Sequence, residues 1–147
     1  MSDSLSDLER IAAQVPYLTW LGVRFSLDAG GLVAHLPYAP QLIGNPLQPA
    51  LHGGVTAAFL EITALAALSL NMREAQGSMP VALARTIDIS IDYLRPGRPE
   101  DCHARAIITR AGRRYASVRA EAWQFDPARP IAAATGHFLM PRTASAG

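Results

Sequence analysis

The feature that most constrains the fold is a long apolar run from Leu51 to Asn71, LHGGVTAAFLEITALAALSLN. From Val55 to Leu70 almost every residue is apolar or small, which predicts a helix with no face left for water. Such a helix must be enclosed by protein or by lipid. The fully apolar part is about 16 residues long, shorter than the roughly 20 that a bilayer requires. It also carries Glu61 near its centre, so the pattern favours the core helix of a globular protein over a membrane span.

Glu61 is the one acidic residue in this apolar run. A carboxylate among apolar side chains is costly to desolvate, so it is retained only if it is paired, hydrogen-bonded or needed for chemistry. One interpretation is structural, with Glu61 bonded to a neighbouring backbone group or to an arginine inside the core. The other is functional, and it makes Glu61 the first candidate for a catalytic carboxylate.

Length and composition exclude several classes of protein. The chain has 147 residues without internal repeats, so residues 1–147 are expected to form a single domain. A net charge of +1 predicts neither a nucleic-acid partner nor an anionic membrane. The single cysteine, Cys102, excludes an intramolecular disulfide, and the acidic N-terminal residues differ from a signal peptide. We therefore expect a cytoplasmic protein without a metal site.

The segments before the long helix are expected to be helical and then extended. Residues 1–22 are predicted to be a helical segment, and Ser6 and Glu9 have the spacing of a capping box. Alternating residues predict a hairpin of two strands, 23–27 and 32–36. The segment 37–50 contains four prolines, which predicts a loop without regular structure.

After the long helix the apolar period changes to two residues, which is typical of strands. Consecutive strands joined by short turns are antiparallel, so a four-stranded meander is expected. The predicted fold class is α+β, in which one long helix lies against a curved antiparallel sheet of about six strands. A flexible tail is expected at 141–147. The four strands are predicted at 82–93, 102–109, 115–125 and 131–140.

Three motifs occur together in the part of the chain between Val23 and Met140: HGGVTAAFLE at 52–61, TIDISIDYLRPGR at 86–98, and AGRRYA at 111–116. This combination resembles the hotdog-fold thioesterase superfamily, and within it the branch that includes the phenylacetic-acid-pathway thioesterases. The resemblance implies a homodimer whose sheets pair edge to edge, often doubled into a homotetramer. It also implies hydrolysis of acyl-CoA thioesters without a metal or other cofactor.

The resemblance also assigns two polar positions outside the helix. Thr86 falls where related enzymes use a small hydroxyl to position the water or the acid. The family commonly has Asn or Gln six residues before the HGG histidine, where this chain has Pro46. Either Asn45 or Gln48 can fill that position, and the choice stays open.

The two glycines that open the helix are candidate ligand contacts. Glycine lets a ligand approach the backbone, and the free N–H groups at a helix N-terminus favour negative charge. The resemblance assigns the thioester carbonyl to the Gly53 N–H and catalysis to Glu61. Gly54 is a further candidate contact for the ligand. The alternative is that both glycines only permit tight entry into the helix.

The spacing of Gly53 and Glu61 has a consequence for assembly. Eight residues along one helix correspond to about 12 Å, so the two cannot act on one carbonyl within a chain. A shared site requires two antiparallel helices related by a two-fold axis. The carboxylate can be the nucleophile or a general base, and both roles stay open.

His52 is a candidate base, although hydrogen bonds that anchor the start of the helix are its expected role. Arg95, Arg113 and Arg114 lie at turns between strands, where guanidinium groups can hold the phosphates of CoA. Solvated turn charges are the alternative explanation for these arginines.

The leading hypothesis is an acyl-CoA thioesterase that releases a carboxylic acid and free CoA from an aryl or medium-chain substrate. An apolar slot beside the helix is expected to hold the acyl group. A non-catalytic acyl-CoA-binding or sensing module is the main alternative. A hotdog dehydratase should carry an acid and histidine pair, which is not evident. The residues expected to line the slot are Tyr17, Trp20, Phe59 and Leu60.

Overall fold

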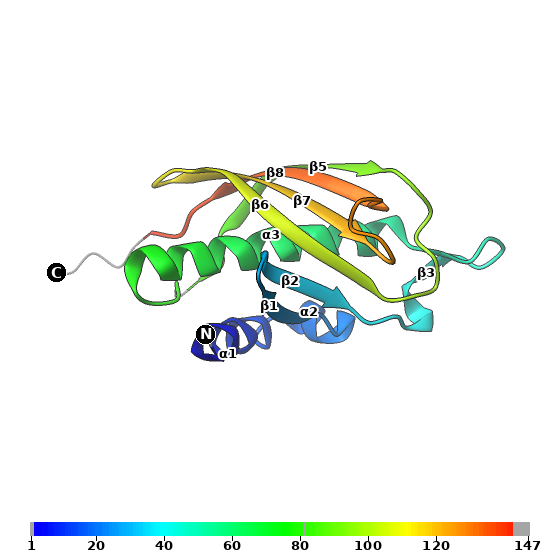
Figure 1. Cartoon of the computed structure of the whole chain (residues 1–147), viewed down its shortest axis with the longest axis horizontal. Helices are drawn as coiled ribbons and strands as arrows, with labels where there is room; N and C mark the ends of the chain where they lie inside the picture. The colour runs from blue at the N-terminus through cyan, green and yellow to red at the C-terminus, as the bar shows by residue number, and fades with distance from the viewer. Residues whose placement is uncertain (1, 81, 143–147) are drawn as a thin grey trace.

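One long helix lies across a curved antiparallel sheet in the computed structural model, which describes residues 2–80 and 82–142 (Figure 1). The sheet curls around this helix. Two short N-terminal helices lie on the other side of the long helix from the β6–β8 strands. The elements are α1 (Ser2–Ala12), α2 (Pro16–Leu21), β1 (Arg24–Asp28), β2 (Gly31–Leu36), η1 (Pro40–Leu42), β3 (Ile43–Asn45), β4 (Ala50–Leu51), α3 (Gly53–Gln76), β5 (Arg85–Tyr93), β6 (Cys102–Ala111), β7 (Tyr115–Trp123) and β8 (Ala132–Leu139).

The main sheet has six strands in the order β1-β2-β6-β7-β8-β5, and all neighbours are antiparallel. The predicted α+β class and strand number are therefore confirmed. The predicted meander was wrong at one point, because β5 pairs with β8 and not with β6. Residues 94–101 contain two prolines and are too long for a tight hairpin turn, so they cross the end of the sheet. As a result β5 has a free edge.

Helix α3 is longer than the apolar run that predicted it. It begins at Gly53 and ends at Gln76, where Gly77 adopts the left-handed conformation with φ 79° and its N–H bonds the Arg73 carbonyl. Its length and apolar composition would suffice to cross a membrane, but 56% of its most apolar window is buried inside the protein. Core helices of globular proteins share these properties, and the packing of α3 on the sheet identifies it as one.

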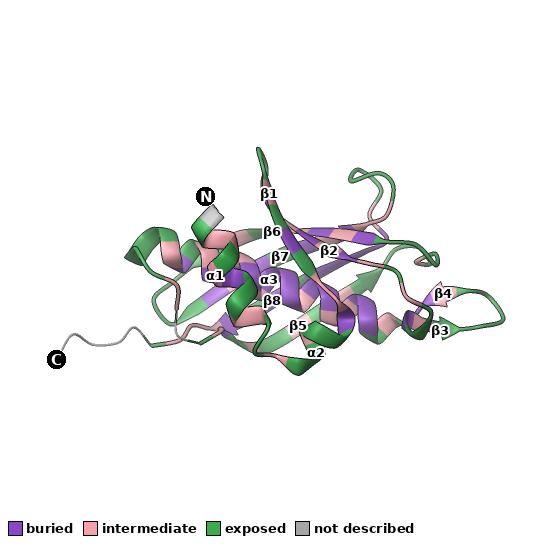
Figure 2. Cartoon of the chain, turned by 90° about the horizontal axis from the view of Figure 1, so that it is seen from below, coloured by how far each residue is buried: buried purple, intermediate pink, exposed green. Residues whose placement is uncertain are grey.

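The core joins large side chains of α3 to small side chains of the sheet. Figure 2 shows the buried residues, in purple, along α3 and on the strands of the sheet. Phe59, Leu60 and Leu68 are at most 1% exposed and lie against a sheet face built largely of alanine. The expectation that Phe59 and Leu60 line an acyl slot was therefore wrong, because both point into the core. The buried alanines of the sheet are Ala34, Ala104, Ala116, Ala120, Ala122, Ala132, Ala133 and Ala134.

One stripe of α3 is not covered in the single chain. Ala57, Ala58, Glu61 and Leu65 are all only half-buried, and their spacing places them on one face of the helix. The expectation that no face is left for water was thus wrong for one chain. The sequence pattern indicates that this stripe is mostly apolar, but it does not indicate which part of the structure covers the stripe.

Three local expectations need correction or fall outside the described residues. Helix α1 begins at Ser2, with Asp3 in its first turn, so Ser6 lies inside the helix and is not its N-cap. The segment 37–50 does have regular structure, because Ile43 and Leu51 pair in the short β3–β4 hairpin after a 3-10 turn. Most of the predicted tail, residues 143–147, lies outside the part of the chain that the structure describes.

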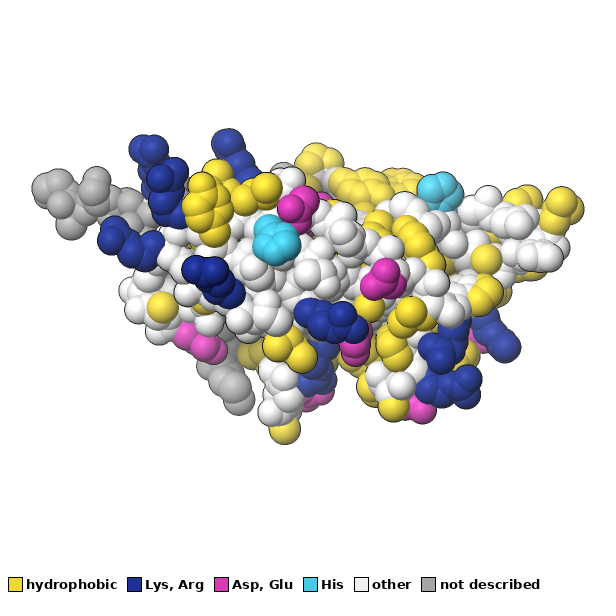
Figure 3. All heavy atoms as spheres, turned by 90° about the horizontal axis from the view of Figure 1, so that it is seen from above, with side chains coloured by type: hydrophobic (Ala, Val, Ile, Leu, Met, Phe, Trp, Pro, Cys, Tyr) yellow, Lys and Arg dark blue, Asp and Glu magenta, His cyan; other side chains and the backbone are white. Residues whose placement is uncertain are grey.

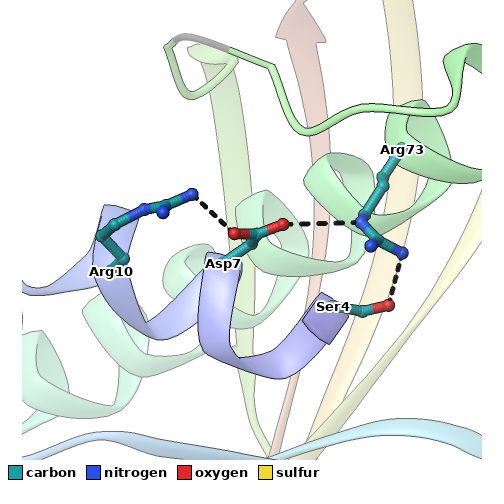
Figure 4. Close-up of polar contacts among 4 residues, drawn as sticks. All are labelled: Ser4, Asp7, Arg10 and Arg73. Atoms are coloured by element: carbon teal, nitrogen blue, oxygen red, sulfur yellow. Dashed lines mark hydrogen bonds and ion pairs between the residues drawn. The ribbon is translucent and has the colours of Figure 1, made fainter. Parts of the chain in front are cut away.

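Polar contacts attach α1 to the C-terminal half of α3 (Figure 4). The Arg73 Nη1 donates to the Ser4 Oγ at 2.6 Å, and the Arg73 Nε lies 3.7 Å from the Asp7 Oδ2. Arg10 pairs with the other oxygen of the same carboxylate at 2.5 Å. Asp7 thus bridges two guanidinium groups and fixes the position of α1.

Candidate active site

His52 is the N-cap of α3. Its Nδ1 accepts a hydrogen bond from the Gly54 N–H at 2.9 Å, so this nitrogen carries no proton. In the neutral ring the proton is therefore on Nε2, which makes the exposed face of His52 a hydrogen-bond donor. The bond also occupies Nδ1, so this nitrogen anchors the helix start and is not free to act as a base.

The two glycines at the helix start differ in what their N–H groups do. The Gly54 N–H is used by His52, whereas no described hydrogen bond involves the Gly53 N–H. A free N–H at a helix N-terminus is suited to an oxyanion. Of the two predicted contacts, Gly53 is thus the one with an available backbone donor.

A cavity of about 360 Å³ lies beside Gly53. The Tyr93 hydroxyl donates a hydrogen bond to the Gly53 carbonyl at 2.7 Å, and Arg95 donates from Nη1 to the Pro130 carbonyl at 2.6 Å. The structure therefore brings together Gly53 and Arg95, two of the predicted site residues. We call this region the glycine end. The lining includes Gly53, Thr56, Tyr93, Arg95, Pro96 and Ile131.

Glu61 lies two turns further along α3, on the half-buried stripe, and does not line this cavity. Within residues 2–80 and 82–142 its carboxylate accepts no hydrogen bond and pairs with no cation. The structural interpretation, in which a core arginine or backbone group satisfies Glu61, is therefore not supported. A half-buried carboxylate without a partner is available to a ligand or to a second chain.

Thr86 reaches the helix-facing side of the sheet through a β-bulge. The pairing of β5 with β8 skips Ile87, so Thr86 lies opposite Phe138 and Asp88 opposite His137. Phe138 is fully buried against α3, and residues directly opposite each other share one face of a sheet. Simple alternation predicted Thr86 on the polar face with Asp88. The bulge instead turns Thr86 toward the helix and leaves Ile87 53% exposed.

Asn45 and Gln48 both lie in the β3–β4 hairpin. The Asn45 Oδ1 accepts hydrogen bonds from the Leu47 N–H at 3.0 Å and from the Gln48 N–H at 3.4 Å, so it closes the turn of the hairpin. Both side chains are exposed, and neither lines the cavity beside Gly53. The single chain thus does not bring either residue to the glycine end.

Arg113 and Arg114 lie at the opposite end of the sheet, on its outer face. A cavity of about 450 Å³ there is lined by Arg110, Arg113, Arg114, Tyr115, Ser117 and His137, a region that we call the arginine end. The Arg114 guanidinium lies 5.9 Å from the centre of the Tyr115 ring. None of these three arginines forms an ion pair with a described carboxylate, and Figure 3 shows dark blue side chains gathered at this end. One chain therefore does not bring Arg95 together with Arg113 and Arg114.

Other chemistries find little support among residues 2–80 and 82–142. No three His, Cys, Asp or Glu side chains there lie close enough together to hold a metal ion. Burial raises the pKa of the Cys102 thiol to about 12, so Cys102 is not a nucleophile near neutral pH.

Tyr93 contacts Gly53 and lines the cavity, but it was not among the site residues predicted from the sequence. The alternation of apolar and polar residues along β5 could have identified Tyr93. The alternation puts Tyr93 on the same face as Ile89 and Ile91, toward α3, and a tyrosine at the end of such a strand brings a hydroxyl to the helix.

The long helix within a curved antiparallel sheet defines a hotdog-fold protein. A family model described as the thioesterase superfamily matches residues 48–131, which span the helix start, α3 and strands β5 to β7. The chain belongs to the thioesterase superfamily. The expected enzyme class, a thioester hydrolase, agrees with this membership.

Individual relatives agree with this assignment. The medium/long-chain acyl-CoA thioesterase YigI of Escherichia coli K12 is 35% identical over 108 residues, which cover 69% of each chain. A Bacillus halodurans protein crystallised with CoA has a TM-score of 0.70 at 24% identity, with 97% of this chain and 93% of the other covered. A Ralstonia eutropha protein described as a putative thioesterase related to phenylacetic acid degradation has a TM-score of 0.68 at 24% identity, with 90% and 98% covered. The last two similarities show a shared fold.

Proposed function

We propose that this protein hydrolyses acyl-CoA thioesters to a carboxylic acid and free CoA. The observation that carries the proposal is the unbonded Gly53 N–H at the start of α3, beside a cavity, in a chain of the thioesterase superfamily. The Gly53 N–H stabilises the negative charge that develops on the thioester oxygen, and the positive end of the helix dipole adds to this effect.

The complete site is proposed to form between two copies of the chain. Gly53 and Glu61 are about 12 Å apart along one helix, so the carboxylate must come from a second copy. Two features support a two-fold dimer: the free edge of β5 and the uncovered stripe of α3 that holds Glu61. If two β5 strands pair antiparallel about Ile89, the Thr86 end of one chain lies beside the Tyr93 end of the other.

In this arrangement Glu61 acts on the carbonyl carbon while Gly53 binds the carbonyl oxygen. Glu61 either attacks the carbon directly, which gives an anhydride that water then hydrolyses, or it removes a proton from an attacking water. In both routes the thiolate of CoA leaves and is protonated. A single turnover in H₂¹⁸O tests the direct route, because ¹⁸O enters the Glu61 carboxylate only when water cleaves an anhydride at the Glu61 carbonyl carbon.

Arginine side chains are proposed to hold the phosphates of CoA. Arg95 is next to Gly53, whereas Arg113 and Arg114 lie at the other end of the same chain. Antiparallel pairing of β5 moves the arginine end of one copy toward the glycine end of the other. Under this proposal the phosphates of a substrate bound at Gly53 are held by Arg113 and Arg114 of the second copy.

The acyl group is proposed to be of medium chain length, with aryl groups as the second candidate. The similarity to the medium/long-chain thioesterase YigI supports the first. Tyr17 and Trp20 of α2 are 46% and 51% exposed, and their rings stack at 5.9 Å. They are the aromatic side chains of the predicted slot that stay accessible to an acyl chain.

The experiment that tests the proposal is free-thiol release from a panel of alkyl- and aryl-CoA esters. Glu61→Gln removes the carboxylate but keeps its size, and kcat/KM should fall by about 100-fold or more. Glu74→Gln, at an exposed position of α3, is the matched control and should keep full activity. A wild type that binds acyl-CoA but cleaves no ester would instead favour the non-catalytic binding module. A fully active Glu61→Gln variant would exclude the carboxylate mechanism.

A further inference from the structure

The first peptide group of α3 is bonded by side chains on both of its sides. Its carbonyl, from Gly53, accepts a hydrogen bond from the Tyr93 hydroxyl at 2.7 Å. Its N–H, from Gly54, donates to the His52 Nδ1 at 2.9 Å. The two side chains come from different parts of the fold, since Tyr93 ends β5 and His52 precedes the helix.

This double contact fixes the turn that presents the free Gly53 N–H. The ends of helices fray, and their first N–H groups lack intrahelical partners. Two hydrogen bonds to one peptide group set its plane. The adjacent 52–53 peptide, which carries the Gly53 N–H, is held through its own carbonyl, which accepts hydrogen bonds from the Val55 and Thr56 N–H groups. Oxyanion donors work only when held close to their productive geometry, so such fixing has a direct effect on rate.

Close packing adds to the hydrogen bond. A Cβ atom at Gly53 would lie 3.1 Å from the Tyr93 hydroxyl oxygen and 3.3 Å from the ring carbon that bears it. The Tyr93 ring therefore rests on the position where any other residue would carry a side chain. A side chain at position 53 would therefore require the Tyr93 ring to shift by a few tenths of an ångström.

Tyr93 itself contributes little to the core. The residue is 58% exposed, it lies on the free edge strand, and its ring forms part of the wall of the 360 Å³ cavity. Its one described hydrogen bond goes to the residue whose N–H is the proposed oxyanion donor.

We propose that Tyr93 is a positioning residue that holds the Gly53 N–H in place for the thioester oxygen. The inference rests on the proposed function, and it adds a residue that acts through Gly53 and not on the substrate. Because Tyr93 lies on β5, pairing of this strand with a second copy also secures the donor.

The test is Tyr93→Phe, which keeps the ring and removes the hydroxyl. The expected result is a fall in kcat of about 10-fold, with KM within about twofold of the wild type, because the donor acts mainly in the transition state. Tyr38→Phe is the matched control, since the Tyr38 hydroxyl forms no described hydrogen bond and lies away from the cavity. It should retain the wild-type kcat and KM.

A second measurement reports the positioning without turnover. Hydrogen exchange at the Gly54 and Val55 amides, which are bonded to His52, should be faster in Tyr93→Phe, whereas exchange at the buried residues 62–64 should stay unchanged. This pattern separates local loosening of the helix start from general destabilisation.

The outcomes distinguish the two proposals. If the wild type cleaves no ester, the proposed function fails before Tyr93 is tested. If the wild type is active but Tyr93→Phe has the same kcat, the positioning role is overturned alone. A higher KM with unchanged kcat would also overturn it, because the hydroxyl would then serve binding. Unchanged exchange at the Gly54 and Val55 amides would remove the structural basis of the inference.

Discussion

The two ends of the sheet differ in whether their polar groups are held by hydrogen bonds. At the glycine end, the backbone of Gly53 and Gly54 is bonded by Tyr93 and His52, so that one N–H is left free in a fixed place. At the arginine end, three guanidinium groups surround a larger cavity without any described carboxylate partner. One end offers a single directed donor, and the other offers charge without fixed direction.

This difference suits two different parts of one ligand. A thioester oxygen needs a donor within a few tenths of an ångström of the correct position, whereas phosphates accept many approaches of a flexible cation. We therefore expect substitutions at the glycine end to change kcat and substitutions at the arginine end to change KM. The predictions for Gly53 and for Arg113 with Arg114 test that contrast directly, and the other two test the stability of the surrounding structure.

The largest expected effect is that of Gly53→Ala. The added Cβ meets the Tyr93 hydroxyl at 3.1 Å and displaces the oxyanion donor, so kcat should fall by about 100-fold. Steady-state kinetics with an acyl-CoA ester that the wild type cleaves measures this fall in kcat. In a Tyr93→Phe background the same substitution should cost less, because the nearest clashing atom is gone. Strictly additive losses would show that the two residues act independently.

At the C-terminal half of α3, Arg73→Ala should lower the free energy of unfolding by about 2 kcal/mol. The reason is the loss of the bond to Ser4 and of the contact with Asp7 that attach α1. Chemical denaturation measures the change. Arg10→Ala is the control, because the Arg10 side chain is 70% exposed and its ion pair with Asp7 should contribute less than about 1 kcal/mol. Equal losses in both variants would argue against a special role of Arg73.

At the arginine end, the double variant with Arg113→Ala and Arg114→Ala should raise KM by about 10-fold and leave kcat nearly unchanged, since the contacts are proposed to bind CoA in ground and transition state alike. The effect should shrink at high salt, because exposed charges are screened. Kinetics at two ionic strengths measure both. Arg129→Ala, in the turn before β8, is the matched control. A fall in kcat with unchanged KM would contradict the contrast between the ends.

The smallest effect concerns pH and His103, on the outer face near the glycine end. Burial and the neighbouring His35 lower the pKa of His103, whereas Asp101 acts in the opposite direction. The unfolded chain therefore binds a proton more readily, and stability is lost as pH falls from about 6.5 toward the lowered pKa. His103→Gln should reduce this loss, which thermal unfolding between pH 7.5 and 5 can measure. If the stability of the wild type and of His103→Gln depended equally on pH, His103 would not be the cause of the loss.

Much of the fold was predictable from local patterns. The apolar run gave α3, and alternation gave β1, β2 and the four later strands to within a few residues. The order of the strands was not predictable in the same way, because β5 and β8 pair across about 40 intervening residues. The bulge was not predictable either, because Ile87 fits the alternation of apolar and polar residues. Only the pairing with β8 shows that Thr86 lies on the other face of the sheet.

The candidate site was predictable only in part. The HGG motif and Glu61 were found because both lie on one continuous segment. The bond between Tyr93 and Gly53 joins residues 40 positions apart, and no spacing rule contains it. The uncovered side of Glu61 could not be predicted either, because an apolar pattern does not reveal which surfaces a single chain leaves open.

The bulge at Ile87 also restricts which strands can pair with the free edge of β5. A nine-residue strand with a free edge is a template to which unrelated chains can add and aggregate. The bulge interrupts the regular row of edge donors and acceptors and leaves only residues 88–93 as an even stretch. If β5 pairs with a second copy, as proposed, that copy must match both the interruption and the short even stretch.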